Sequence, residues 1–206
     1  MTTQYYRRLT SMEREVGRHF LSYPQRTDSN YSKHELICCD AYVVFVHAEI
    51  ESYLENCATR ALDLAKKAMD SDRYNRILFS LVGHYRREVQ AGESIERKPD
   101  KDIWRERGGS AISRHQDTIK ANHGIRQENI FKLLSPVGFD VRTIDDVLLL
   151  ELDQLGEHRG STAHVSLRER RSAVIDPFVR RKQVTELMGL LQGLDSDISS
   201  YLRQHR

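Results

Sequence analysis

Arg159 and His164, with four residues between them, are the pair whose types and spacing could do chemistry in this chain. A histidine titrates near neutral pH and can move protons. An arginine can grip phosphate through its planar fork and stabilise charge in a transition state. Together they suit cleavage of an RNA phosphodiester, in which the 2′-hydroxyl is the nucleophile and no metal is required. The residues between them are small, which predicts a tight turn with room for a ligand, and Ser161 or Thr162 could donate hydrogen bonds to phosphate.

The spacing alone is weak evidence, because this composition supplies roughly one such match by chance. Arg14 and His19 have the same spacing on a predicted amphipathic helix, and we interpret that pair as coincidence. The structural alternative is that Arg159 caps the end of a helix and that His164 packs against a neighbour. The local sequence leaves both interpretations open.

A polar stripe on the longest predicted helix, residues 34–70, offers partners for this pair. Asp40, His47 and Glu51 fall within roughly 40° of one another around the helix axis. Polar groups on an otherwise apolar helix must be paired, hydrated or exposed to a cleft. The stripe could therefore face the catalytic pair, with Glu51 as the carboxylate partner of Arg159 and His47 near the substrate. The alternative is that Asp40 stabilises the helix start and that Glu51 is simply exposed.

Hydrophobic periodicity predicts helices in every long segment and no strand. The fold class is therefore all-α, an up-down bundle of four to six helices. Two domains are expected, an N-terminal helix and loop over residues 1–33 and a helical domain over residues 34–206. Residues 92–116 are charged and contain two adjacent glycines, which predicts an excursion or flexible loop. Helices are predicted over residues 4–22, 34–70 and 73–91, and a short one within residues 124–140 ends near Pro136. A further helix opens with a capping box at Thr143 and Asp146, and a last helix runs from Asp176-Pro177 to about residue 203.

The net charge of +2 is too small to indicate nucleic-acid binding by itself. A basic cluster that follows the Arg159 and His164 pair could nevertheless hold phosphates, with Arg168 and Arg170 as candidate substrate contacts. A solvated surface is the alternative. The cluster consists of Arg168, Arg170, Arg171, Arg180, Arg181 and Lys182.

The three cysteines lack the spacing of a disulfide framework and indicate reduced, buried thiols in a cytoplasmic protein. We expect no signal peptide and no membrane span, because no apolar run is long enough. No Cys-x2-Cys or His-x3-His pair is present, so we expect no metal and no cofactor. A nucleophile-elbow Gly-x-Ser-x-Gly is also missing, which disfavours serine hydrolase chemistry.

Three segments resemble the HEPN superfamily, most closely its stand-alone RiboL-PSP-type members. The stretch "LGEHRGSTAH" resembles the Arg-x4-6-His signature of that superfamily. The stretch "AYVVFVHAEIESYLE" is similar to the helix that opens the core of those members. The segment "KANHGIRQENIFKLLSPVGFDVRTIDDVLLLELDQL" looks like the one that precedes the signature. The resemblance covers about residues 34–200.

The resemblance implies a helical bundle that dimerises, with two signatures meeting at one composite cleft. It implies a metal-independent endoribonuclease that leaves 2′,3′-cyclic phosphate ends, acting as a toxin or in phage defence, with a possible antitoxin partner. The catalytic residues carry over to Arg159, His164 and the helix-borne acid Glu51. Gly160 stands where the family often has asparagine, and some members are inactive. The alternative is therefore a non-catalytic module that binds RNA, nucleotide or a partner protein.

Overall fold

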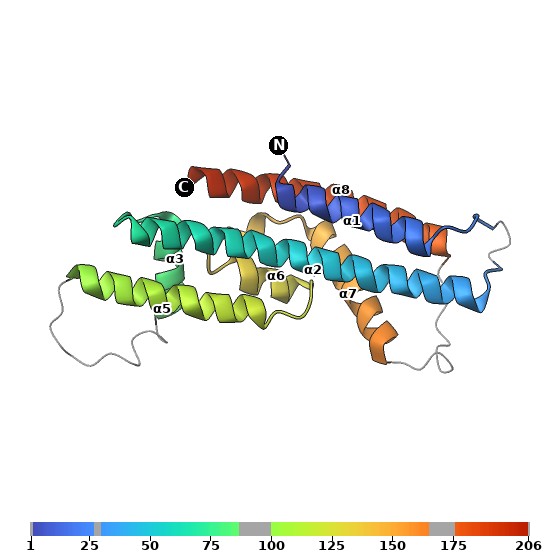
Figure 1. Cartoon of the computed structure of the whole chain (residues 1–206), viewed down its shortest axis with the longest axis horizontal. Helices are drawn as coiled ribbons and strands as arrows, with labels where there is room; N and C mark the ends of the chain where they lie inside the picture. The colour runs from blue at the N-terminus through green and yellow to red at the C-terminus, as the bar shows by residue number, and fades with distance from the viewer. Residues whose placement is uncertain (1, 27–29, 87–99, 165–175, 206) are drawn as a thin grey trace. The chain divides into compact units, whose positions relative to one another are not determined.

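The structure, a computed structural model, describes residues 2–26, 30–86, 100–164 and 176–205 (Figure 1). Only the backbone is described for residues 100–102 and 161–164. These ranges contain seven α-helices and no strand, which confirms the all-α prediction and adds one helix to its upper limit. The elements are α1 (Gln4–Phe20), α2 (Lys33–Asp70), α3 (Arg76–His84), α5 (Asp100–Lys120), α6 (Gln127–Leu134), the 3-10 helix η1 (Val141–Thr143), α7 (Asp146–His164) and α8 (Pro177–Gln204).

The additional helix is α5, which occupies most of the predicted excursion. The expectation of a loop over residues 100–116 is wrong, and residues 92–99 lie outside the described ranges. Two glycines inside a helix each cost about 1 kcal/mol relative to alanine. A Cβ at Gly108 would come within 3.1 Å of Met69 Sδ and 3.2 Å of Leu78 Cδ1. Gly108 therefore permits a close approach of α5 to its neighbours, and that packing offsets the low helix propensity.

Side-chain caps begin five of the described helices, including α1 at Thr3 and α3 at Asn75. Asp176 accepts hydrogen bonds from the amides of Phe178 and Val179, which confirms the predicted start of α8. The capping box predicted for α7 at Thr143 and Asp146 is wrong, because Asp145 accepts from the backbone amides at the start of α7. At the start of α2, the Glu35 carboxylate accepts from the Ser32 amide and the Ser32 hydroxyl accepts from the Glu35 amide. This reciprocal pair is a capping box.

Contacts divide the chain into two units. Unit 1 contains Met1–Tyr53, Gly124–Gln127 and Ile144–Ser196. Unit 2 contains Leu54–His123, Glu128–Thr143 and Asp197–Arg206. The division crosses the expected boundary after residue 33, because α1 packs with the first part of α2 and of α8. Within unit 1, α1 lies alongside α8 (Figure 1), and the Tyr6 hydroxyl donates to the Met188 carbonyl at 2.7 Å.

A buried carboxylate ties the N-terminal segment to α8 in unit 1. Asp195 is fully buried and accepts from the Thr3 amide at 2.7 Å and from the Thr3 hydroxyl. The Tyr53 hydroxyl donates to the same carboxylate at 3.2 Å. A buried carboxylate is stable only when donors replace its water, and three donors do so here. Sequence reasoning did not find this residue.

Unit 2 is built on apolar residues with a few satisfied polar groups. Ile77, Leu81, Ile130 and Leu133 are fully buried. Gly138 has a φ of +84°, and a Cβ there would collide with side chains of unit 2, so the turn after α6 requires glycine.

No helix in the described ranges combines the length and the hydrophobicity needed to cross a membrane.

Candidate functional site

The polar stripe of α2 meets α7 and α8 inside unit 1. The approach is driven by apolar side chains: Val43 and Val46 of α2 and Leu152 of α7 are completely buried. Polar residues at the edges of these apolar faces are thereby brought together, and we call this set the polar seam. It consists of Asp40, His47 and Glu51 of α2, His158 and Arg159 of α7, and Arg180 of α8.

His47 is the buried centre of the polar seam. Its residue surface is 3% exposed, and its Nδ1 lies 3.7 Å from Glu51 Oε2. Burial, and after it the positive charge of Arg159, lowers the pKa of His47 to about 4. The imidazole is therefore neutral at pH 7, and its contact with Glu51 is a polar contact at long range rather than an ion pair.

His158 joins the other end of the stripe to α8. Its Nε2 lies 3.5 Å from Asp40 Oδ1, and its Nδ1 lies 3.5 Å from Arg180 Nη2. An arginine can only donate, so Nδ1 is the acceptor and the imidazole proton is on Nε2, facing Asp40. Sequence reasoning missed His158. Its position directly before Arg159 on the same helix was the available signal.

Arg180 is buried in the polar seam rather than lying on a basic surface. It is 8% exposed and donates to Gln183 Oε1 at 3.1 Å. Burial lowers the pKa of Arg180, and Cys39, Asp40 and Glu151 oppose this shift. The expected basic cluster is thus divided. Lys182 points to solvent near Glu186, at 3.8 Å, and Arg168, Arg170 and Arg171 lie outside the described residues.

Arg159 and His164 both belong to α7. The expectation of a tight turn between them is wrong, because the helix continues through His164. Arg159 is half-buried and Gly160 faces open space. At 3.6 residues per turn, positions 159 and 164 are separated by about 140° around the helix axis. The side chains of Ser161, Thr162 and His164 lie outside the described part of the structure.

A small cavity lies beside Arg180 of the polar seam. A cavity of about 10 Å³ is lined by Glu151, Leu155, Arg180, Gln183, Val184 and Leu187. A cavity of this size holds at most about one water molecule.

Thiols and metal ligands do not add to this site. Cys38, Cys39 and Cys57 are free thiols, and burial raises the pKa of Cys39 to about 11. Within the described ranges, no three His, Cys, Asp or Glu side chains are grouped so that they could hold a metal ion.

A comparison with models of known protein families, with curated proteins and with solved structures finds no match to this chain. The likeness of its motifs to the HEPN superfamily therefore carries only an expectation of function. The contacts of the polar seam are the physical basis on which a function can be proposed.

Proposed function

We propose that this protein is a metal-independent endoribonuclease in which Arg159 and His164 act on the RNA backbone. The 2′-oxygen bonds to phosphorus as the bond to the 5′-oxygen breaks, leaving a 2′,3′-cyclic phosphate. His164 removes the 2′-hydroxyl proton or protonates the leaving 5′-oxygen. Arg159 stabilises the negative charge on the phosphorus centre. The free thiols support a reducing compartment such as the cytoplasm.

The proposal is supported by the charge of Arg159, which together with burial lowers the pKa of His47, the neighbour of Glu51 on the stripe. A flexible surface arginine gains little from a phosphate contact, because ordering its side chain costs entropy. In the proposal, the polar side chains of α2 favour one position of the guanidinium. We assign His47 and Glu51 as positioning residues for Arg159, which is half-buried.

A second copy of the chain is part of the proposal. The helical separation of positions 159 and 164 disfavours a pair formed within one chain. Two α7 helices related by a two-fold axis would place the arginine of one chain near the histidine of the other. Mixing Arg159→Ala and His164→Ala subunits then restores about a quarter of wild-type cleavage, because half of the dimers regain one of two sites. No recovery would place both residues in one chain.

The direct test is cleavage of RNA in EDTA, with products assayed for 2′,3′-cyclic phosphate ends. Wild-type protein should cut, and His164→Ala should not. His19→Ala is the matched control, because His19 is exposed and follows Arg14 with the same spacing. Intact RNA with wild-type protein, or equal cutting by His164→Ala and wild type, would contradict the proposal.

RNA binding without cleavage is the second candidate function. It is favoured by the cavity of about 10 Å³ beside Arg180 of the polar seam, which is too small to hold a phosphate. It is also favoured by Gly160, where related signatures often have a polar residue. Saturable RNA binding with no products after long incubation would select this candidate.

A further inference from the structure

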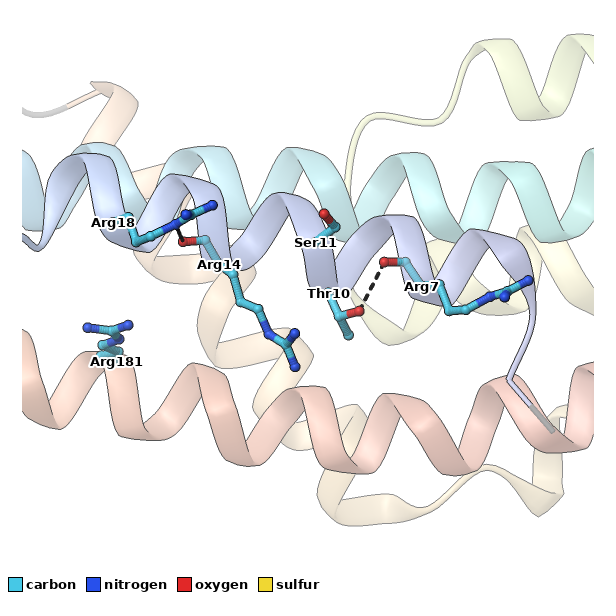
Figure 2. A pocket seen from close by; sticks show the side chains of 6 residues that line it. All are labelled: Arg7, Thr10, Ser11, Arg14, Arg18 and Arg181. Carbon is cyan, nitrogen blue, oxygen red and sulfur yellow. Dashed lines mark hydrogen bonds between the residues drawn. The ribbon is translucent and has the colours of Figure 1, made fainter.

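An open pocket of about 660 Å³ lies between α1 and α8 of unit 1 (Figure 2). Its lining carries four arginines and two hydroxyls, and we call it the arginine groove. In Figure 2, Arg14 extends from α1 toward α8, and Arg181 extends from α8 toward α1. The lining residues are Arg7, Thr10, Ser11, Arg14, Arg18 and Arg181.

The arginines of α1 form a straight row. Arg7, Arg14 and Arg18 lie within about 40° of one another around the helix axis. Their eleven-residue separation corresponds to about 16 Å along the helix. All three are exposed, and Arg181 faces them from α8. A row of this length exceeds what one phosphate can contact and matches a linear polyanion.

The positive charge of the groove exceeds the negative charge that the described residues place near it. No described carboxylate lies within 4.0 Å of any of the four guanidinium groups. The nearby Glu13 instead accepts a hydrogen bond from the Tyr42 hydroxyl at 2.8 Å. Arg14 and Arg18 are one turn apart, where like charges destabilise a helix. An anion in the groove would relieve this repulsion.

The chemistry of the lining selects phosphates rather than bases. Arginine forks bind phosphate oxygens through two parallel hydrogen bonds. The Thr10 hydroxyl already donates to the Arg7 carbonyl at 3.0 Å, which leaves the Ser11 hydroxyl as a further donor. No aromatic ring lines the groove to stack on a base. Contacts of this kind hold a nucleic-acid backbone without reading its sequence.

A lipid surface fits the groove less well. The apolar face of α1, with Tyr6, Leu9 and Val16, is buried in unit 1. An interfacial helix needs that face free to enter the lipid. We propose that the arginine groove binds the phosphate backbone of single-stranded RNA independently of sequence. The proposed nuclease activity shares this partner, but the groove lies on other residues and needs no cleavage.

The test measures binding of fluorescent oligouridine of about 12 nucleotides by anisotropy, over about 50 to 200 mM salt. All proteins carry His164→Ala, so that cleavage does not enter. The groove variant is Arg14→Gln with Arg181→Gln. The matched control, Arg8→Gln with Lys182→Gln, removes the same charge from the same helices, outside the lining. Thermal melts establish that each variant is folded.

The groove variant should lose about tenfold or more in affinity, and its salt slope should fall by about 1.4, or about 0.7 for each lost phosphate contact. The control should stay within about twofold of the parent. Single-stranded DNA should bind as RNA does, because no contact reaches the 2′-hydroxyl. Equal losses in groove variant and control, an unchanged salt slope, or tighter binding to phosphatidylserine vesicles than to RNA would overturn the proposal. Absence of RNA cleavage by the wild-type protein would refute only the nuclease.

Discussion

Two buried histidines, one in each unit, have the same acidity and different surroundings. Burial lowers the pKa of both His47 and His115 to about 4. His115 is completely buried, with Nδ1 3.0 Å from the Tyr85 hydroxyl and Nε2 3.1 Å from the Leu133 carbonyl. His47 instead lies beside the Glu51 carboxylate and the charge of Arg159. A depressed histidine pKa therefore does not identify a functional site, whereas charged neighbours at a partly exposed edge favour one.

The hydrogen bonds of His115 explain why we assign it a structural role. The Leu133 carbonyl can only accept, so Nε2 carries the proton and Nδ1 accepts from the Tyr85 hydroxyl. Both ring nitrogens are thus satisfied by neutral groups. Adding a proton to Nδ1 would require the Tyr85 hydroxyl to turn and accept instead of donate.

The largest expected effect is a loss of cleavage on substitution of Arg159 in unit 1, in contrast to a loss of stability on substitution of His115 in unit 2. Arg159→Ala should lower RNA cleavage by about 10² to 10³-fold, because a charge-stabilising donor is lost, and should leave the melting temperature nearly unchanged. His115→Gln should have the opposite profile, with lower stability and normal cleavage per folded molecule. Cleavage rates and thermal melts on the same samples measure both. Loss of cleavage in folded His115→Gln would remove the distinction.

The next effect is acid sensitivity shared by both units. Each histidine has a folded pKa of about 4 and an unfolded value near 6.5, so below pH 6.5 the unfolded state binds protons that the folded state does not. Stability is therefore highest above pH 6.5 and falls as the pH approaches 4, by up to roughly 3 kcal/mol for each histidine. Urea unfolding at several pH values measures the loss. His115→Gln should remove about half of it, and a flat profile between pH 6.5 and 4 would disprove the assignment.

Removal of the His115 hydrogen bonds at pH 7, where the imidazole is neutral, should lower the stability somewhat less. His115→Leu leaves the Tyr85 hydroxyl and the Leu133 carbonyl without their partner, at about 1–3 kcal/mol for each group that stays unsatisfied. His115→Gln can keep one of these bonds and should be the milder variant. Chemical denaturation at pH 7 compares the two. Equal stability of both variants would mean that the hydrogen bonds contribute little.

The smallest effect concerns the start of α2, which carries the stripe of the polar seam. Ser32→Ala should destabilise the protein by about 1 kcal/mol through loss of the N-cap. Ser32→Asp should retain most of the stability, because aspartate is an equally good cap. Hydrogen exchange in the first turn of α2 should rise in Ser32→Ala and stay low in Ser32→Asp. Unchanged exchange in both would show that packing alone holds this end.

The sequence by itself determined the helices and the shared face of the stripe. Periodicity and local caps are read within one turn, so α2 and the Asp176 cap of α8 were predicted close to their observed places. The capping box of Ser32 and Glu35 could have been recognised from the sequence in the same way, but it was not predicted. The helix at residues 100–116, where a loop was expected, could not be predicted from the sequence. Gly108 is favourable in that helix only through its close contact with other helices.

Only the tertiary structure decided which polar residues meet and which are buried. His158 pairs with Asp40 and Arg180 because apolar packing of α7 and α8 on α2 brings distant positions together. Arg14 had been set aside as part of a chance match, and it lines the arginine groove with Arg181 from the far end of the chain. Periodicity specifies the face of a helix on which a residue lies. It contains no information on the helix that this face meets, because that choice depends on packing between segments distant in sequence.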